Sequence, residues 1–383
     1  MAADIADAEA AISRMDAEAP ALVDTEAPAR ILLRAEALAS SRIEGLEVEA
    51  RRLLCAEAAR SIGQVSSDVT ATGVLGNIDA MVYGVQRATA GDEITTALLL
   101  EMHQRLLAGT HLLQYAGRLR DVQNWIGGSD YNPCSAAYVP PPPEYVPDLF
   151  SDLCAFCNSA ELPAVAQAAI AHAQFETIHP FVDGNGRTGR ALIHLILRRR
   201  GLALRVVPPV SLVLATSARS YIDGLTRYRH TSSPTSAAAM AAVNTWTARF
   251  AAACTRCVAD ASSFQARATE LESQWRRQLG SVRANSATDI LLRVLPGAPI
   301  LTIRGTEALL QRTFKPTQAA LHRLIEAGIL REITLAGRNR AFEAPEIINA
   351  FTALERQLAS PHGDTRTSPP ARPVPYRRPL SPP

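Results

Sequence analysis

The stretch from His179 to Arg190 reads HPFVDGNGRTGR, and it determines what fold and chemistry we expect of the chain. Its three glycines lie within the seven residues 183–189 and allow a tight turn whose backbone N–H groups point inward. Such a nest of N–H groups binds anions. The apolar run that follows, ALIHLILR, predicts a helix whose positive end adds to the attraction. The stretch therefore predicts an anion-binding turn at the start of a helix.

The charged side chains of this stretch indicate phosphate chemistry. Arg187 and Arg190 are three residues apart, so both project from the first helical turn and can reach phosphates. Asp183 is the only carboxylate of the loop and would be repelled by phosphates unless Mg²⁺ lay between them. His179, near its intrinsic pKa, can accept a hydroxyl proton at neutral pH. Together they favour phosphoryl or nucleotidyl transfer over a plain glycine-rich connection.

The bulk composition sets outer limits. A chain of 383 residues is long enough for two or three domains. Its formal net charge of +2 gives no whole-chain signature of a nucleic-acid or membrane binder. We find no apolar run of about 18 residues, and the acidic N-terminus does not resemble a secretory signal. We therefore expect a cytoplasmic protein with no membrane partner.

Other reactive side chains give weaker signals. The pairs Cys154/Cys157 and Cys254/Cys257 lie in helix-like segments far apart in sequence, so we expect reduced thiols rather than a zinc site. Three histidines lie in helical patterns and are expected to be structural or surface residues: His103, His172 and His194.

The hydrophobic periodicity predicts a mainly α-helical chain. The expected helices cover 31–60, 74–88, 95–107, 147–158, 164–177, a segment from 190, 211–229 and 235–278. Thr95 or Thr96 is expected to cap the third of them. Between these helices, residues 122–128 end in two glycines and are followed by Tyr138 and four prolines, which predicts a β-hairpin or extended flap.

A second unit is expected after residue 284. Helices over 286–295, 302–311 and 315–327, followed by strands over 329–334 and 340–344, are typical of a winged helix-turn-helix. It could bind DNA through the third helix, Arg338 and Arg340, although that helix is only weakly basic. It could equally bind a protein partner or a second copy in a homodimer. The chain beyond Ser360 is rich in Pro, Arg and Ser and is expected to be disordered.

The stretch 179–190 resembles the signature of Fic-domain proteins, His-Pro-Phe-x-Asp/Glu-Gly-Asn-Gly-Arg-x-x-Arg, at every specified position. The resemblance extends over about 30–230. It implies a mainly α protein with a Fic-type helical core, a β-hairpin flap and, in this chain, a small winged-helix domain after them. The expected domains are an N-terminal helical region with the inhibitory helix at 1–90, the Fic catalytic core at 91–230, a helical extension at 231–283, the winged helix-turn-helix at 284–357 and a disordered tail at 358–383.

The resemblance also implies roles for single residues. His179 would be the general base that deprotonates a Ser, Thr or Tyr hydroxyl of a target protein, and Asp183 would hold Mg²⁺. Asn185 would contact the α-phosphate. The residues that would bind ATP are Gly184, Asn185, Gly186, Arg187, Gly189 and Arg190. The flap that would clamp the target by strand addition consists of Val122, Gln123, Asn124, Trp125, Ile126 and Gly127.

An internal inhibitor is implied as well. Ser40, Glu44 and Gly45 match the inhibitory motif Ser/Thr-x-x-x-Glu-Gly/Asn of many Fic proteins. A bidentate salt bridge from Glu44 to Arg190 would occupy the group needed for the γ-phosphate. The expected function is thus a protein adenylyltransferase autoinhibited by Glu44. Two alternatives stay open: a Fic enzyme that removes AMP or uses another nucleotide, and a DNA-binding regulator with a nucleotide-sensing core.

Overall fold

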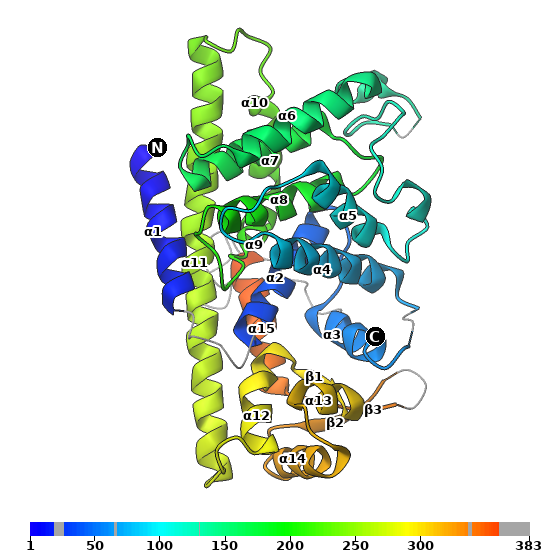
Figure 1. Cartoon of the computed structure of the whole chain (residues 1–383), viewed down its shortest axis with the longest axis vertical. Helices are drawn as coiled ribbons and strands as arrows, with labels where there is room; N and C mark the ends of the chain where they lie inside the picture. Colours follow the sequence, from blue (N-terminus) through cyan, green and yellow to red (C-terminus); the bar gives the residue numbers. More distant parts are fainter. Residues whose placement is uncertain (19–26, 65–66, 130, 336–338, 360–383) are drawn as a thin grey trace, which may run out of the picture.

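The computed structural model describes residues 1–18, 27–64, 67–129, 131–335 and 339–359, and most of them lie in helices (Figure 1). The first part of the chain forms α1 (Ala2–Glu18), α2 (Ala27–Ile43), α3 (Ala50–Arg60), α4 (Val69–Arg87), α5 (Thr96–Leu107), α6 (Val146–Asn158), α7 (Ala164–Ile178), α8 (Asn185–Arg199), α9 (Val210–Thr216), α10 (Ala218–Tyr228) and α11 (Ala237–Leu279). The second part forms α12 (Ala287–Val294), the 3₁₀ turn η4 (Leu295–Gly297), β1 (Ile300–Thr302), α13 (Ile303–Leu310), α14 (Phe314–Glu326), β2 (Arg331–Leu335), β3 (Asn339–Glu343) and α15 (Pro345–Ala359). The predicted mainly helical class is confirmed.

Side-chain caps define where several helices begin. The hydroxyl of Thr95 accepts from the N–H of Leu98 at 3.1 Å, which confirms the predicted start of α5. Ser236 caps α11 in the same way through the N–H of Ala239, at 3.1 Å. These caps satisfy N–H groups that would otherwise lack partners at the helix ends.

The continuous helix predicted over 31–60 was wrong, because the chain breaks at Gly45. Gly45 has a φ of 78° and its N–H donates to the carbonyl of Arg42 at 3.0 Å, which ends α2. A left-handed residue after a helix is usually glycine, since it lacks a Cβ. Glu44 therefore lies just beyond the last residue of α2, not in the middle of a helix.

Of the two predicted forms of the flap, the β-hairpin was wrong and the extended form is the one observed. Described residues 122–129 and 131–139 make only one antiparallel bridge, between Ile126 and Tyr138, with Ile126 N donating to Tyr138 O at 2.9 Å. The positive φ angles of Gly127 (72°) and Gly128 (81°) turn the chain away immediately afterwards. Prolines on the other side lack the N–H that a ladder needs. The flap is therefore an extended loop fixed at one point.

The long helix α11, with 43 residues, runs along most of the molecule and contacts both parts (Figure 1). In the upper part of Figure 1 it packs on α1 and α7, and in the lower part on α12 and α15. Trp275 of α11 is fully buried and donates its indole N–H to Glu346 of α15 at 2.6 Å. No helix in the described part of the chain combines the length and apolarity needed to cross a membrane.

The second part contains a small antiparallel sheet of order β1-β3-β2 beside α12, α13 and α14. The helices and the two strands lie within about two residues of their predicted positions, whereas β1 was not predicted. Arg338 and residues 360–383 of the tail predicted to be disordered lie outside the described residues. The predicted start of that tail at 358 was wrong, because 358 and 359 belong to α15. This part packs on α2 and α3. Arg34 donates to the carbonyl of Gly297 at 2.6 Å, and Arg51 pairs with the buried Glu343 at 2.8 Å.

A close approach of α4 and α5 generates a stability test. A Cβ added to Gly76 would lie 2.5 Å from the carbonyl oxygen of Leu106, which is backbone and cannot move aside. We expect Gly76→Ala to lower the free energy of unfolding by about 1–3 kcal/mol, as overpacking does, although alanine favours helix. Urea denaturation measures the change.

Gly73, one turn earlier in α4, is the matched control. Its Cβ would make only an ordinary contact of 3.4 Å, with the side chain of Leu46. Gly73→Ala should leave stability unchanged or raise it by up to about 1 kcal/mol. Equal effects of the two substitutions would contradict the close approach.

Candidate active site

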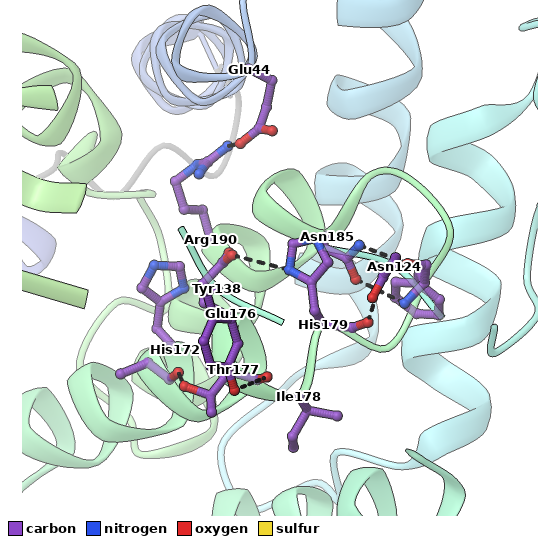
Figure 2. Close-up of polar contacts among 12 residues, drawn as sticks. Glu44, Asn124, Tyr138, His172, Glu176, Thr177, Ile178, His179, Asn185 and Arg190 are labelled. Carbon is purple, nitrogen blue, oxygen red and sulfur yellow. Dashed lines mark hydrogen bonds and ion pairs between the residues drawn. The ribbon is translucent and has the colours of Figure 1, made fainter. Parts of the chain in front are cut away.

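The predicted catalytic loop joins α7 to α8, and Figure 2 shows Glu44 and Asn124, from two distant segments, beside its residues His179, Asn185 and Arg190. His179 ends α7 in a left-handed conformation with φ 49° and ψ 61°, and its N–H donates to the carbonyl of Phe175 at 2.9 Å. Gly184, with φ 77°, precedes the first residue of α8. A left-handed conformation is unfavourable for a residue with a Cβ, so neighbouring groups must hold His179 in place.

Arg120 and Asn124 hold the backbone of the loop. Arg120 is buried and its Nε donates to the carbonyl of His179 at 2.8 Å, while Asn124 donates to the carbonyl of Phe181 at 3.0 Å. Nη1 of Arg120 donates to the carbonyl of Val122 at 3.1 Å, and Nη2 donates to the carbonyl of Pro141 at 2.5 Å. The amide of Asn124, predicted to dock a target, thus faces the catalytic loop.

The side chain of Asn185 closes the loop on itself. Its Oδ1 accepts from the N–H of Phe181 and its Nδ2 donates to the carbonyl of Phe181, both at 2.8 Å. The amide is therefore engaged within the loop. The expected contact of Asn185 with the α-phosphate would have to come from its backbone N–H. The Phe181 ring itself is fully buried, 5.9 Å from the Phe150 ring centroid.

His103 of α5 is a supporting residue that sequence reasoning described only as structural or surface. Its ring stacks on Phe181 with centroids 3.8 Å apart. Nδ1 accepts from the N–H of Gly117 at 3.1 Å, so Nε2 carries the hydrogen and donates to the carbonyl of Asp183 at 2.9 Å. Burial lowers the pKa of His103 to about 4, which keeps the ring in this neutral form. The His103 ring thus fixes the backbone carbonyl of Asp183, the predicted metal ligand.

Arg190 is fully enclosed and is held by α2 (Figure 2). Its Nη2 lies 2.7 Å from Oε1 of Glu44, and it also donates to the hydroxyl and carbonyl of Ser40 at 2.9 and 2.8 Å. The expected bidentate bridge to Glu44 was wrong, because Ser40 takes the remaining donors at this edge of the guanidinium. Tyr221 adds a longer contact of 3.4 Å.

Glu44 occupies the anion nest itself. A Cβ on Gly186 would lie 2.0 Å from Oε1 of Glu44, so only glycine allows the carboxylate to approach the first turn of α8. Burial alone would raise the pKa of Glu44, but Arg190, Arg187 and His179 together hold that pKa below its usual value. Glu44 is therefore an anion in the place where we expect phosphates to bind.

Asp183 and Arg187 lie at the open side of the loop. Their side chains pair at 3.2 Å, with Asp183 46% exposed and Arg187 only 6% exposed. Among the described residues no group of three or more His, Cys, Asp or Glu side chains converges on one point. Mg²⁺ often binds through one carboxylate together with water and substrate phosphates, and the accessible carboxylate of Asp183 fits that mode.

His179 has the protonation state that a general base needs. Its pKa is lowered to about 4, first by burial and then by Arg229, so the ring is neutral at neutral pH. We expected a value near the intrinsic one, and burial explains the difference. Nδ1 has no hydrogen-bond partner among the described residues and faces Oε2 of Glu176 at 3.9 Å.

Further polar contacts anchor α2 over α8. Glu36 is fully buried and accepts from Nε2 of His194 at 2.9 Å, and from the N–H and hydroxyl of Ser211 at 2.7 and 2.5 Å. Asn77 of α4 donates to the carbonyl of Ala37 at 2.9 Å. Because Glu36, Ser40 and Glu44 are spaced by four residues, one face of α2, continued just beyond its end, carries these polar contacts to α8 and α9.

The ties of His103 to the loop generate a prediction. In His103→Leu the N–H of Gly117 and the carbonyl of Asp183 lose their partner, and we expect the free energy of unfolding to fall by about 2–4 kcal/mol. His111→Leu removes an exposed ring nearby and should change stability by less than about 0.5 kcal/mol. Urea denaturation of both variants at neutral pH makes the comparison.

The lowered pKa of His103 adds a dependence on pH. Between the ordinary pKa of 6.5 and about 4 the unfolded chain binds a proton that the folded ring does not, so stability falls as pH decreases through this window. His103→Leu should lose less stability than the wild type over the same range. A parallel decline in both proteins would show that His103 is not buried as described.

The comparisons with known proteins agree with this geometry. Residues 93–197 match the model of the Fic/DOC family, and residues 2–86 match that of the Fic/DOC family N-terminal region. The protein adenylyltransferase fic-1 of Caenorhabditis elegans is 37% identical over 133 residues, 34% of this chain and 23% of that protein. The protein adenylyltransferase Fic of Drosophila grimshawi is 34% identical over 138 residues, 35% of this chain and 26% of that protein.

The matched region is about a quarter of the length of these curated relatives. Among solved structures, a Fic family protein from Desulfovibrio desulfuricans G20 has a TM-score of 0.55 at 21% identity. The likeness covers 89% of this chain and 95% of that one, and at this identity it concerns the fold alone. The chain thus contains a Fic domain preceded by the N-terminal region of the Fic/DOC family.

Proposed function

We propose that this protein is an adenylyltransferase that transfers AMP from ATP to a Ser, Thr or Tyr hydroxyl of a target protein, and that Glu44 restrains it. The observation that carries the proposal is the meeting of a neutral His179 with a glycine-rich nest and two buried arginines at the start of α8. The names of the curated relatives support the same reaction.

The reaction follows from these groups. The target hydroxyl oxygen attacks the α-phosphorus, the bond to the β-phosphate oxygen breaks, and pyrophosphate leaves. His179 takes the hydroxyl proton on Nε2. The N–H groups of the nest, with Arg187 and Arg190, bind the phosphates and stabilise the developing charge. Mg²⁺, when bound by Asp183, neutralises phosphate charge.

The restraint is a competition between two anions. Glu44 lies against Gly186 and binds Arg190, so the triphosphate and the carboxylate require the same space and the same guanidinium. A productive pose of ATP needs Glu44 to leave. The resting protein should therefore have little activity despite a complete loop.

A second activity is compatible with the position of Glu44. Its side chain is 34% exposed at the edge of the nest, where a carboxylate can orient a water molecule against an AMP-modified hydroxyl. The nest is also expected to bind the phosphates of a nucleotide rather than its nucleobase. Mass spectrometry of the Glu44→Gly protein incubated separately with ATP, GTP, CTP and UTP identifies the transferred group.

Substituting Glu44 tests the restraint. We expect Glu44→Gly to raise self-labelling by radiolabelled ATP about tenfold or more, because one charge-assisted hydrogen bond to Arg190 is worth about 1.5–3 kcal/mol. Adding His179→Ala should abolish the labelling. Glu47→Gly removes an exposed glutamate nearby and should behave as the wild type does. Equal labelling of the wild type and Glu44→Gly would disprove the restraint.

We also propose that α12, α13, α14 and the sheet form a winged helix that binds a protein partner. Two of its arginines serve internal contacts: Arg323 donates to the carbonyls of Leu279 and Ser281 at 3.1 and 2.9 Å, and Arg340 pairs with Glu332 at 2.6 Å. Their charges are therefore less available to phosphates.

A gel shift with random duplex DNA at several salt concentrations tests the alternative partner. A protein-binding unit should produce no salt-sensitive shift at physiological ionic strength. A shift that weakens steeply with salt would favour DNA, and we would then abandon the protein-partner proposal.

A further inference from the structure

Glu176 is a buried carboxylate one turn before His179 on α7. Its side chain is 8% exposed, and Oε2 lies 3.9 Å from Nδ1 of His179 (Figure 2). Oε1 has no hydrogen-bond partner among the described residues, and neither does Nδ1 of His179. Oε2 of Glu176 and Nδ1 of His179 thus face each other, and the backbone carbonyl of Glu176 also acts on the His179 ring.

The loop motif leaves room for this carboxylate. A Cβ on Gly189 would lie 2.9 Å from Oε1 of Glu176 and 2.9 Å from Cδ1 of Phe175. Gly189 therefore allows the carboxyl group of Glu176 to pack against the backbone of α8, next to the His179 ring. Gly189 is also expected to bind nucleotide, and the contact with Glu176 is a second reason for a glycine at this position.

The charged and titratable groups around Glu176 come from several elements. They are Glu44 beyond α2, His172 and His179 of α7, Arg190 of α8, Tyr221 of α10 and Arg229 after α10. Burial raises the pKa of Glu176 to about 7 although Arg190 and Arg229 oppose the change, and Glu44 adds to it. Burial lowers the pKa of His172 to about 3, so that ring stays neutral.

The state of this carboxyl group selects the tautomer of His179. A general base at Nε2 requires the hydrogen on Nδ1. Ionised Glu176 accepts a hydrogen bond from Nδ1–H, whereas protonated Glu176 donates to Nδ1 and leaves the hydrogen on Nε2. The distance of 3.9 Å must shorten for either bond, and catalytic hydrogen bonds commonly tighten when substrate binds.

We propose that Glu176 is a positioning residue that sets the tautomer of His179, an inference that rests on the proposed AMP transfer. In the reaction Nε2 takes the target proton, and the imidazolium keeps its Nδ1–H bonded to the carboxylate of Glu176. The carboxylate stabilises the cation without receiving the proton. The imidazolium releases the proton to solvent after pyrophosphate has left.

The tautomer is measured directly by NMR of the full chain labelled with ¹⁵N-histidine, without nucleotide. At about pH 8.5, well above the pKa of Glu176, we expect Nδ1–H for His179; at about pH 5.5 we expect Nε2–H on a ring that is still neutral. The spectrum of His179→Asn assigns the signals. The proposal would be overturned if His179 of the wild type had the same tautomer at both pH values. This measurement does not depend on a Glu176 variant that folds.

Variants of Glu176 add an independent check. In Glu176→Gln the amide can donate to Nδ1 at every pH, so His179 should carry its hydrogen on Nε2 throughout. Gln174→Leu is the matched control on the same helix, since Gln174 only bonds Tyr228, at 3.0 Å. In Gln174→Leu the tautomer of His179 should change with pH as it does in the wild type. A Glu176→Gln spectrum like that of the control would contradict the proposal.

The activity readout uses the Glu44→Gly background. The rate of self-labelling should fall as pH decreases through a midpoint below 7, because removing Glu44 removes one repelling charge from Glu176. Adding Glu176→Gln should lower the rate at least about 100-fold and abolish this pH dependence, as expected for a wrong tautomer. Glu176→Asp should retain part of the rate and part of its pH dependence. If the background protein does not label at all, AMP transfer fails while the NMR result still decides the role of Glu176.

Discussion

The site depends on the burial of one guanidinium. Arg190 is 1% exposed, and an isolated charge in such a position costs several kcal/mol. Ser40 and Glu44 of the α2 end supply the hydrogen bonds that offset this cost. The carboxylate of Glu44 leaves at a lower cost when another anion replaces it beside Arg190. A nucleotide phosphate is such an anion, so the position of the α2 end and the occupancy of the nest belong to one equilibrium.

The contacts of α2 limit how much of it can move. Glu36 and the carbonyl of Ala37 are held by buried partners on α8, α9 and α4, whereas Glu44 follows the last helical residue and is next to Gly45. Release of Glu44 therefore requires a change only at the end of the helix. Arg42, in that last turn, pairs with Glu355 of α15 at 3.3 Å. The second part of the chain thus contacts the segment that carries the proposed restraint.

The sequence predicted the features that depend on neighbouring residues. It predicted contacts between distant residues only where the resemblance to a family motif indicated them. Residues 179–190 are contiguous, so their spacing was enough to predict the nest and its charges. The partner of Arg190 is 146 residues away and was predicted only through the resemblance to a motif. His103 and Glu176 are single residues in helices, and no spacing rule connects His103 to a loop 80 residues later. The break after α2 depended on one glycine inside an otherwise helical pattern.

The flap and the catalytic base share one support. Arg120 donates to the carbonyls of both His179 and Val122, so a single buried guanidinium positions the left-handed base and the start of the flap. In the proposed reaction, a target segment paired with the flap would therefore be placed relative to His179 through the same guanidinium. Among the described residues the flap makes one bridge, between Ile126 and Tyr138, so it does not form a complete two-stranded ladder within this chain. Of the two predicted forms, a β-hairpin or an extended flap, the chain has the extended one, and strand addition to it remains the docking role that the resemblance implies.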